Sequence, residues 1–213
     1  MSDAAMRNRV SQIAVDDPRK ALELSRRIVD PWFRCQALAH AACGSPEPGA
    51  KTRLLREAFA TATETPDLNR TVSVSAWPLK VLCKSKKAGN LTAETKRLLA
   101  LAQQEKSPVR RADALNLVLG AVLTGPHGLF LEVLKSFRVA CLTPLENGKR
   151  NRKGESLLAQ WVVIVHRRDP SLAEDLLQSL SSQDLRERAR TGLAESGHLD
   201  VESLCTWPNI AQG

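Results

Sequence analysis

The stretch DPRKALELSRRIVDPWFRCQALAHAA at residues 17–42 aligns without gaps with DPSLAEDLLQSLSSQDLRERARTGLA at residues 169–194. Each copy begins with Asp-Pro and continues with apolar residues at intervals of three or four, the spacing of one helix face. Residue type is kept at the aligned positions, which pair Ala21 with Ala173, Leu24 with Leu176, Ile28 with Leu180, Arg34 with Arg186, and Ala37 with Ala189. The chain therefore contains an internal repeat.

A third copy lies midway, where PWFRCQAL at residues 31–38 matches PVRRADAL at residues 108–115. Weaker copies fill the gaps between these three. A basic residue recurs at intervals of 33 to 42 residues, at Arg34, Arg70, Arg111, Lys153 and Arg186. Such a period, with two helices in each unit, is typical of an α-solenoid, in which stacked helix pairs build one continuous core.

The repeated phrase resembles the HEAT-like repeat family, most closely at residues 176–189 and 28–38. The resemblance implies an all-α fold, a right-handed α-α superhelix of about five helical hairpins. It also implies structural roles, in a ladder between units, for Arg34, Arg111 and Arg186. Tetratricopeptide-type repeats have similar periods and are the alternative, although their Trp, Gly and Tyr signature positions are missing here.

We expect a single domain over residues 1–213, with a capping helix at 1–15 and a C-terminal tail at 198–213. The repeats between them are predicted at about 17–48, 49–89, 91–125, 126–168 and 169–197.

Helix boundaries are predicted from Pro and Gly. A capping residue followed by Pro favours a helix start, as in Asp17-Pro18, Asp30-Pro31, Thr65-Pro66, Ser107-Pro108 and Asp169-Pro170. Left-handed helix ends are predicted at Gly44, Gly89, Gly125 and Gly197. Residues 71–76 alternate as a strand would, but their place in the repeat favours a helix, which Pro78 is expected to kink or interrupt.

Composition is that of an ordinary globular domain, with 43% hydrophobic and 25% charged residues among 213. The sequence holds no membrane-spanning segment or signal peptide, so we expect a cytoplasmic protein without membrane contact.

The five cysteines form no Cys-x-x-Cys pair, which favours free thiols. Cys35, His40 and Cys43 share one predicted helix, but a structural zinc site needs a fourth ligand. We expect no metal and no cofactor.

Positive charge is concentrated in the middle of the chain. The net charge is +8, with +10 over residues 61–168 and −5 over residues 169–213. The two densest clusters lie beside glycines, one in a predicted loop at residues 149–153 and the other at residues 84–87. Such a cluster is either a solvated surface or an anion-binding rim. The candidate partner- or anion-binding residues are Lys149, Arg150, Arg152, Lys153, Lys84, Lys86 and Lys87.

No phosphate-binding loop, nucleophile elbow or His-Glu-x-x-His stretch occurs, so an enzyme is the less favoured class and we name no catalytic residue. We expect a non-enzymatic module that presents a solenoid face to a protein partner. The alternative is a HEAT-like protein that binds nucleic acid through its basic face, as DNA glycosylases of this type do with a Trp pair and a catalytic Asp. The residues of those types here are Trp32, Trp77, Trp161 and Asp113, and no motif assigns any of them.

Overall fold

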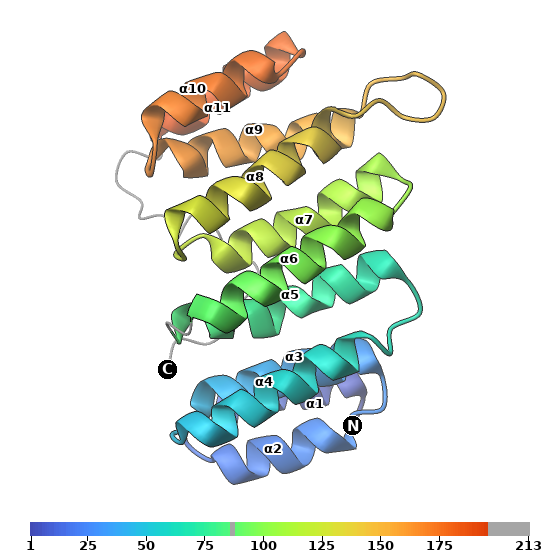
Figure 1. Cartoon of the computed structure of the whole chain (residues 1–213), viewed down its shortest axis with the longest axis vertical. Helices are drawn as coiled ribbons and strands as arrows, with labels where there is room; N and C mark the ends of the chain where they lie inside the picture. Colours follow the sequence, from blue (N-terminus) through green and yellow to red (C-terminus); the bar gives the residue numbers. More distant parts are fainter. Residues whose placement is uncertain (86–87, 196–213) are drawn as a thin grey trace.

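The computed structural model describes residues 1–85 and 88–195, and within these ranges it contains helices and turns but no strand (Figure 1). The predicted all-α class is confirmed. The helices of the described residues are α1 (Asp3–Ile13), α2 (Pro18–Arg27), α3 (Pro31–Gly44), α4 (Pro48–Ala62), α5 (Leu68–Lys84), α6 (Ala88–Gln104), α7 (Pro108–Val122), α8 (His127–Leu142), α9 (Arg152–His166), α10 (Pro170–Ser179) and α11 (Gln183–Glu195).

Four of the predicted helix starts are correct. In each, the side chain before Pro accepts a hydrogen bond from a backbone N–H of the first turn, which satisfies one of the donors that a helix start leaves open. These N-cap residues are Asp17, Asp30, Ser107 and Asp169.

The predicted start at Thr65-Pro66 is wrong. α5 begins two residues later, with Asp67 as the N-cap that accepts from the backbone N–H of Arg70. The Thr65 hydroxyl instead bonds the carbonyl of Ala62 and lies 2.9 Å from the hydroxyl of Thr71. A second capping residue therefore took the role that the Thr-Pro pair was expected to play.

The helices pack in chain order as two rows (Figure 1). The odd-numbered helices each contact the next odd-numbered helix, from α1 to α11, and each even-numbered helix packs against the odd-numbered helices before and after it. The predicted repeats correspond to the pairs α2/α3, α4/α5, α6/α7, α8/α9 and α10/α11, but most even-numbered helices pack more extensively against the odd-numbered helix before them than against the one after. One buried apolar cluster runs through the stack from Val10 to Ala189.

Residues 71–76 lie inside α5, as the repeat predicted, but α5 runs through Pro78 without interruption. Because Pro has no N–H, the carbonyl of Val74 loses its usual partner one turn later. The buried thiol of Cys35 in α3 lies 3.6 Å from that carbonyl and donates to it. Burial raises the pKa of Cys35, which keeps the thiol protonated and able to donate.

The predicted left-handed ends are not observed at the glycines where the structure describes them. Among the described glycines, only Gly148 has a positive φ. Gly89 lies in the first turn of α6, and Gly197 lies outside the described residues. Gly44 ends α3 against the end of α1, where a Cβ would overlap the carbonyl group of Ala14. Close approach, and not a left-handed conformation, is the reason for glycine there.

The cysteines that the structure describes are all free. Within the described part of the chain, no helix combines the length and the apolar character needed to cross a membrane.

Candidate functional site

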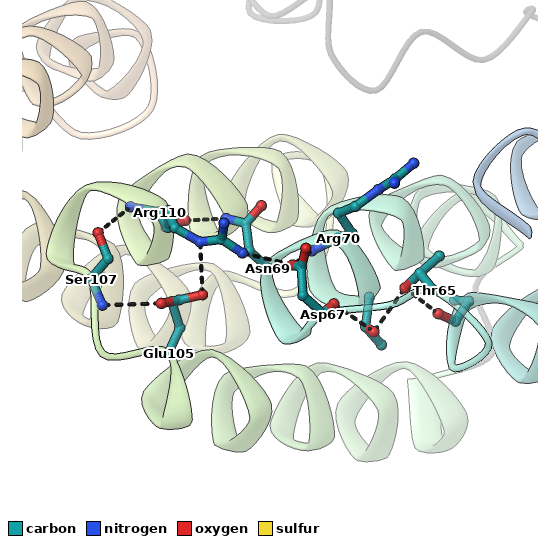
Figure 2. Close-up of polar contacts among 9 residues, drawn as sticks. Thr65, Asp67, Asn69, Arg70, Glu105, Ser107 and Arg110 are labelled. Atoms are coloured by element: carbon teal, nitrogen blue, oxygen red, sulfur yellow. Dashed lines mark hydrogen bonds and ion pairs between the residues drawn. The ribbon is translucent and has the colours of Figure 1, made fainter.

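The turns before α5, α7 and α9 lie on one side of the stack, which we call the start edge (Figure 1). Here Arg110 of α7 bonds two carboxylates: its Nη2 lies 2.8 Å from Oδ1 of Asp67, and its Nε lies 3.0 Å from Oε2 of Glu105. Asn69 of α5 donates to the backbone carbonyl of Arg110 (Figure 2). These contacts join two neighbouring helix pairs.

Ion pairs of the same kind continue along the start edge to the predicted basic cluster at residues 149–153. Lys153 Nζ lies 2.5 Å from Oδ2 of Asp113 in α7. Arg150 holds Glu155 by two hydrogen bonds, of 3.3 and 2.9 Å, and the Ser181 hydroxyl donates to the same carboxylate at 2.5 Å. Two of the four predicted anion-binding cations of this cluster are therefore engaged by acidic side chains of the chain itself.

Glu155 is buried, with 6% of its side chain exposed. Burial alone would raise its pKa, but hydrogen bonds from Arg150 and Ser181 outweigh that effect and lower it. The carboxylate is therefore held in its charged form and bridges the start of α9 to the turn between α10 and α11.

The segment 149–153 is not the free loop that the sequence predicted. α9 begins at Arg152, and Asn151 is its buried N-cap. The Asn151 side chain accepts from Gly154 N at 2.9 Å and donates to Ala140 O of α8 at 3.2 Å. Lys149 and Arg152 remain exposed, without a charged partner among the described residues. The segment docks α9 onto α8.

Lys84, the described member of the second predicted basic cluster, lies at the opposite edge. Lys84 is the last residue of α5, whereas residues 149–153 precede and begin α9, and α5 and α9 run in the same direction in the odd row (Figure 1). Lys86 and Lys87 lie outside the described residues. Lys84 therefore does not share one basic surface with residues 149–153.

The predicted structural arginines have unequal contacts. Arg34 and Arg111 each donate to the carbonyl six residues earlier, at 3.4 Å in both cases, and so hold the turn before their own helix. Arg34 also pairs with Glu64. The side chain of Arg186 has no hydrogen bond or ion pair among the described residues. In α7, the ion pair to the neighbouring unit is made by Arg110, next to Arg111, with Asp67 at the start of α5.

The residues compared with DNA glycosylases are not gathered into one site. Trp161 is buried against Phe130 and Phe137, and its indole donates to Asn116 at 2.6 Å. Asp113 is paired with Lys153, as described above. Trp32 and Trp77 contact each other elsewhere, between α3 and α5. Among the described residues, no group of three or more His, Cys, Asp or Glu side chains is placed to hold a metal ion.

His40 of α3 is a buried side chain that the sequence grouped with Cys35 and Cys43. It is 3% exposed, and neither ring nitrogen has a hydrogen-bond partner in the structure. Burial, together with the positive charge of Arg7 in α1, lowers the pKa of His40 to about 4. The ring is neutral near pH 7 and packs at the joint between α1 and α3.

A groove of about 810 Å³ lies between α2 and α4, and Ala41 of α3 also lines it. The sequence did not predict this groove. Six apolar side chains line it: Pro18, Leu22, Ala41, Pro46, Ala50 and Leu54. At one end Arg26 and Glu57 pair across it at 2.8 Å, and acidic residues stand at the other, where α2 and α4 begin. Because α2 and α4 are not consecutive in the chain, no local sequence signal showed that Leu22 and Leu54 line one groove.

Only some of the charged side chains on the rim of this groove pair with other groups of the chain. Asp17 caps α2 and Arg26 pairs with Glu57. Arg19 and Arg53 are exposed on the rim and have no charged partner among the described residues. No Cys, His or Lys lines the groove. The apolar lining and charged rim suit binding of an apolar segment with charged flanks.

A scan against protein-family models, a search of curated proteins and a search of solved structures each found no match for this chain.

Proposed function

We propose that this chain is a HEAT-like α-solenoid with a non-enzymatic role, a module that binds a protein partner in the groove between α2 and α4. The observation that carries the proposal is the groove itself. It has a volume of about 810 Å³, an apolar lining and exposed arginines on its rim. The linear packing of helix pairs supports the solenoid assignment, because each pair buries its apolar face only against its neighbours.

The partner segment that fits best is an amphipathic helix of about three turns, because the groove runs along α2, which has 10 residues. Apolar residues spaced by three or four would lie on Leu22 and Leu54. Acidic side chains beside that strip would reach Arg19 and Arg53. Ala50 keeps the groove open because its side chain is small.

The nucleic-acid alternative has less support. Arg150 and Lys153 already neutralise Glu155 and Asp113, so only Lys149 and Arg152 of that cluster are available to phosphates. We expect a variant with both of these residues changed to Ser to bind duplex DNA as weakly as the wild type at physiological salt. Clear binding that the double substitution abolishes would favour the nucleic-acid alternative instead.

A photo-crosslinking experiment tests the groove. The photoreactive residue p-benzoyl-phenylalanine replaces Ala50 in the groove or, as a matched control, Ser136 in α8. We expect irradiation in cell extract to give a discrete protein adduct at position 50 only. Peptide mapping of the adduct should identify a segment with helical apolar spacing.

Competition makes the result specific. Excess wild-type protein should suppress the adduct, whereas a Leu22→Asp variant with an unchanged circular dichroism spectrum should not, because a carboxylate on the groove floor opposes apolar contact. Equal adducts at positions 50 and 136, or equal competition by both proteins, would contradict the proposal.

A further inference from the structure

A second surface feature lies where α3 meets α5 in the odd-numbered row. The guanidinium of Arg70 stacks over the ring of Trp32, with its central carbon 5.2 Å from the ring centroid. Trp32 in turn packs edge-on against Trp77, with ring centroids 6.3 Å apart. Arg70 and Trp32 are half-buried, so both present part of their surface to solvent.

Arg70 differs from Arg34 and Arg110, which lie on the neighbouring helices α3 and α7, because it has no acidic partner among the described residues. Arg34 pairs with Glu64, and Arg110 pairs with Asp67. Asp67 lies only one turn from Arg70, but its Oδ1 accepts from Arg110 Nη2 at 2.8 Å and from the backbone N–H of Arg70 at 2.9 Å. In Figure 2 the Arg70 side chain points away from this network.

The contact with Trp32 holds Arg70 in place. A guanidinium stacked on an aromatic face keeps its N–H groups free at the edge, and their planar fork matches the two oxygens of a carboxylate. Because the side chain is already ordered, less conformational entropy is lost when a ligand binds. Trp and Arg are also the residue types most enriched among the strongest contributors to protein interfaces.

We infer that the Trp32–Arg70 pair is a docking point for an acidic segment of a protein partner, in which an Asp or Glu side chain pairs with Arg70 beside the Trp32 ring. The inference does not rest on the groove between α2 and α4. A carboxylate suits the site better than a nucleic-acid backbone, because only one guanidinium is presented beside the Trp32 ring. A run of phosphates needs several cations.

The test follows Trp indole and Arg side-chain N–H signals by NMR while the peptide Ac-Glu-Glu-Glu-Glu-NH2 is added to the full chain. We expect saturable shifts of the Trp32 and Arg70 signals. Arg70→Gln should weaken binding at least about tenfold, since it removes a charge-assisted contact. Arg70→Lys keeps the charge but loses the planar fork, so we expect binding weaker than wild type.

Two controls separate this site from general charge attraction. Arg138→Gln, in α8 of the other row, removes the same charge and should leave binding unchanged. The uncharged peptide Ac-Gln-Gln-Gln-Gln-NH2 should produce no saturable shift. Unchanged amide spectra would show that the variants remain folded.

The inference would be overturned by any of three results: no saturable shift with the Glu peptide, equal binding by wild type and Arg70→Gln, or tighter binding of a thymidine oligonucleotide than of the Glu peptide. Ala50→Trp, which fills the groove between α2 and α4, should leave peptide binding unchanged. The two proposals can therefore fail separately.

Discussion

Two ion pairs near opposite ends of the stack, Arg26–Glu57 and Arg150–Glu155, lie in different surroundings. Arg26 and Glu57 cross the open groove between α2 and α4 with 57% and 36% of their side chains exposed. Glu155 has 6% of its side chain exposed and receives a further hydrogen bond from Ser181 in the next helix pair. Exposed pairs contribute little to stability, whereas a buried carboxylate depends strongly on its partners. The ion pair between α2 and α4, which we call the first joint, is therefore held loosely, whereas the contact of Glu155 with the turn between α10 and α11, the last joint, is fixed.

The largest effect is expected from Glu155→Ala, which should lower the free energy of unfolding by about 3 kcal/mol, because it removes the acceptor of both Arg150 and Ser181. Urea denaturation followed by circular dichroism would measure it. Glu155→Gln, which keeps the shape and loses the charge, should be less destabilising. A loss below about 1 kcal/mol for Glu155→Ala would remove the contrast between the two joints.

Ala114→Leu tests the packing of the middle of the stack, between the two joints. Ala114 is 1% exposed in α7, so the larger side chain should overpack the core and lower the free energy of unfolding by about 2 kcal/mol. Ala60→Leu, at an exposed position of α4, is the matched control and should change it little. An unchanged urea midpoint for Ala114→Leu would show that this core tolerates the added volume.

The pH dependence of stability tests the joint between α1 and α3. The pKa of His40 is lowered to about 4 in the folded state, below the ordinary value of 6.5, so between these values the unfolded chain binds the proton and the folded chain does not. Stability should therefore fall on acidification, by about 1 kcal/mol between pH 7 and pH 5.5. Relative to His40→Leu, the wild type should show this extra loss in denaturation curves; parallel pH profiles would contradict it.

The smallest effect is expected from Glu57→Ala. Removing an exposed partner of Arg26 should change the free energy of unfolding by less than about 1 kcal/mol, and added salt should reduce the difference further. The same urea series as for Glu155→Ala gives a direct comparison. A loss as large as that of Glu155→Ala would mean that the groove end is as rigid as the last joint.

Much of the fold was predictable because its signals are local. Asp17-Pro18 and Asp169-Pro170 mark helix starts through backbone bonds within one turn, and the recurrence of Ala37 and Ala189 marks the buried helix face. The prediction failed at Thr65, where Asp67 competes for the cap within three residues. Propensity alone does not decide between two adequate caps.

The candidate sites were predicted less well because charge is visible in sequence and pairing is not. The cluster at residues 149–153 is basic by composition, yet its Lys153 meets Asp113, some forty residues earlier. The groove joins α2 to α4, and the Arg70 stack joins α5 to α3. Each of these contacts depends on how neighbouring helix pairs are placed.

The sequence by itself determined that this chain is helical, where four of its helices begin, and which small residues are buried, because these features depend on backbone hydrogen bonds and periodicity within a few turns. Only the tertiary structure decided which charges are neutralised. Asp67 could have paired with Arg70 one turn away, but the packing of α7 against α5 brings Arg110 to it and leaves Arg70 on Trp32. Coulomb attraction depends on distance in space, which the stacking of helix pairs sets.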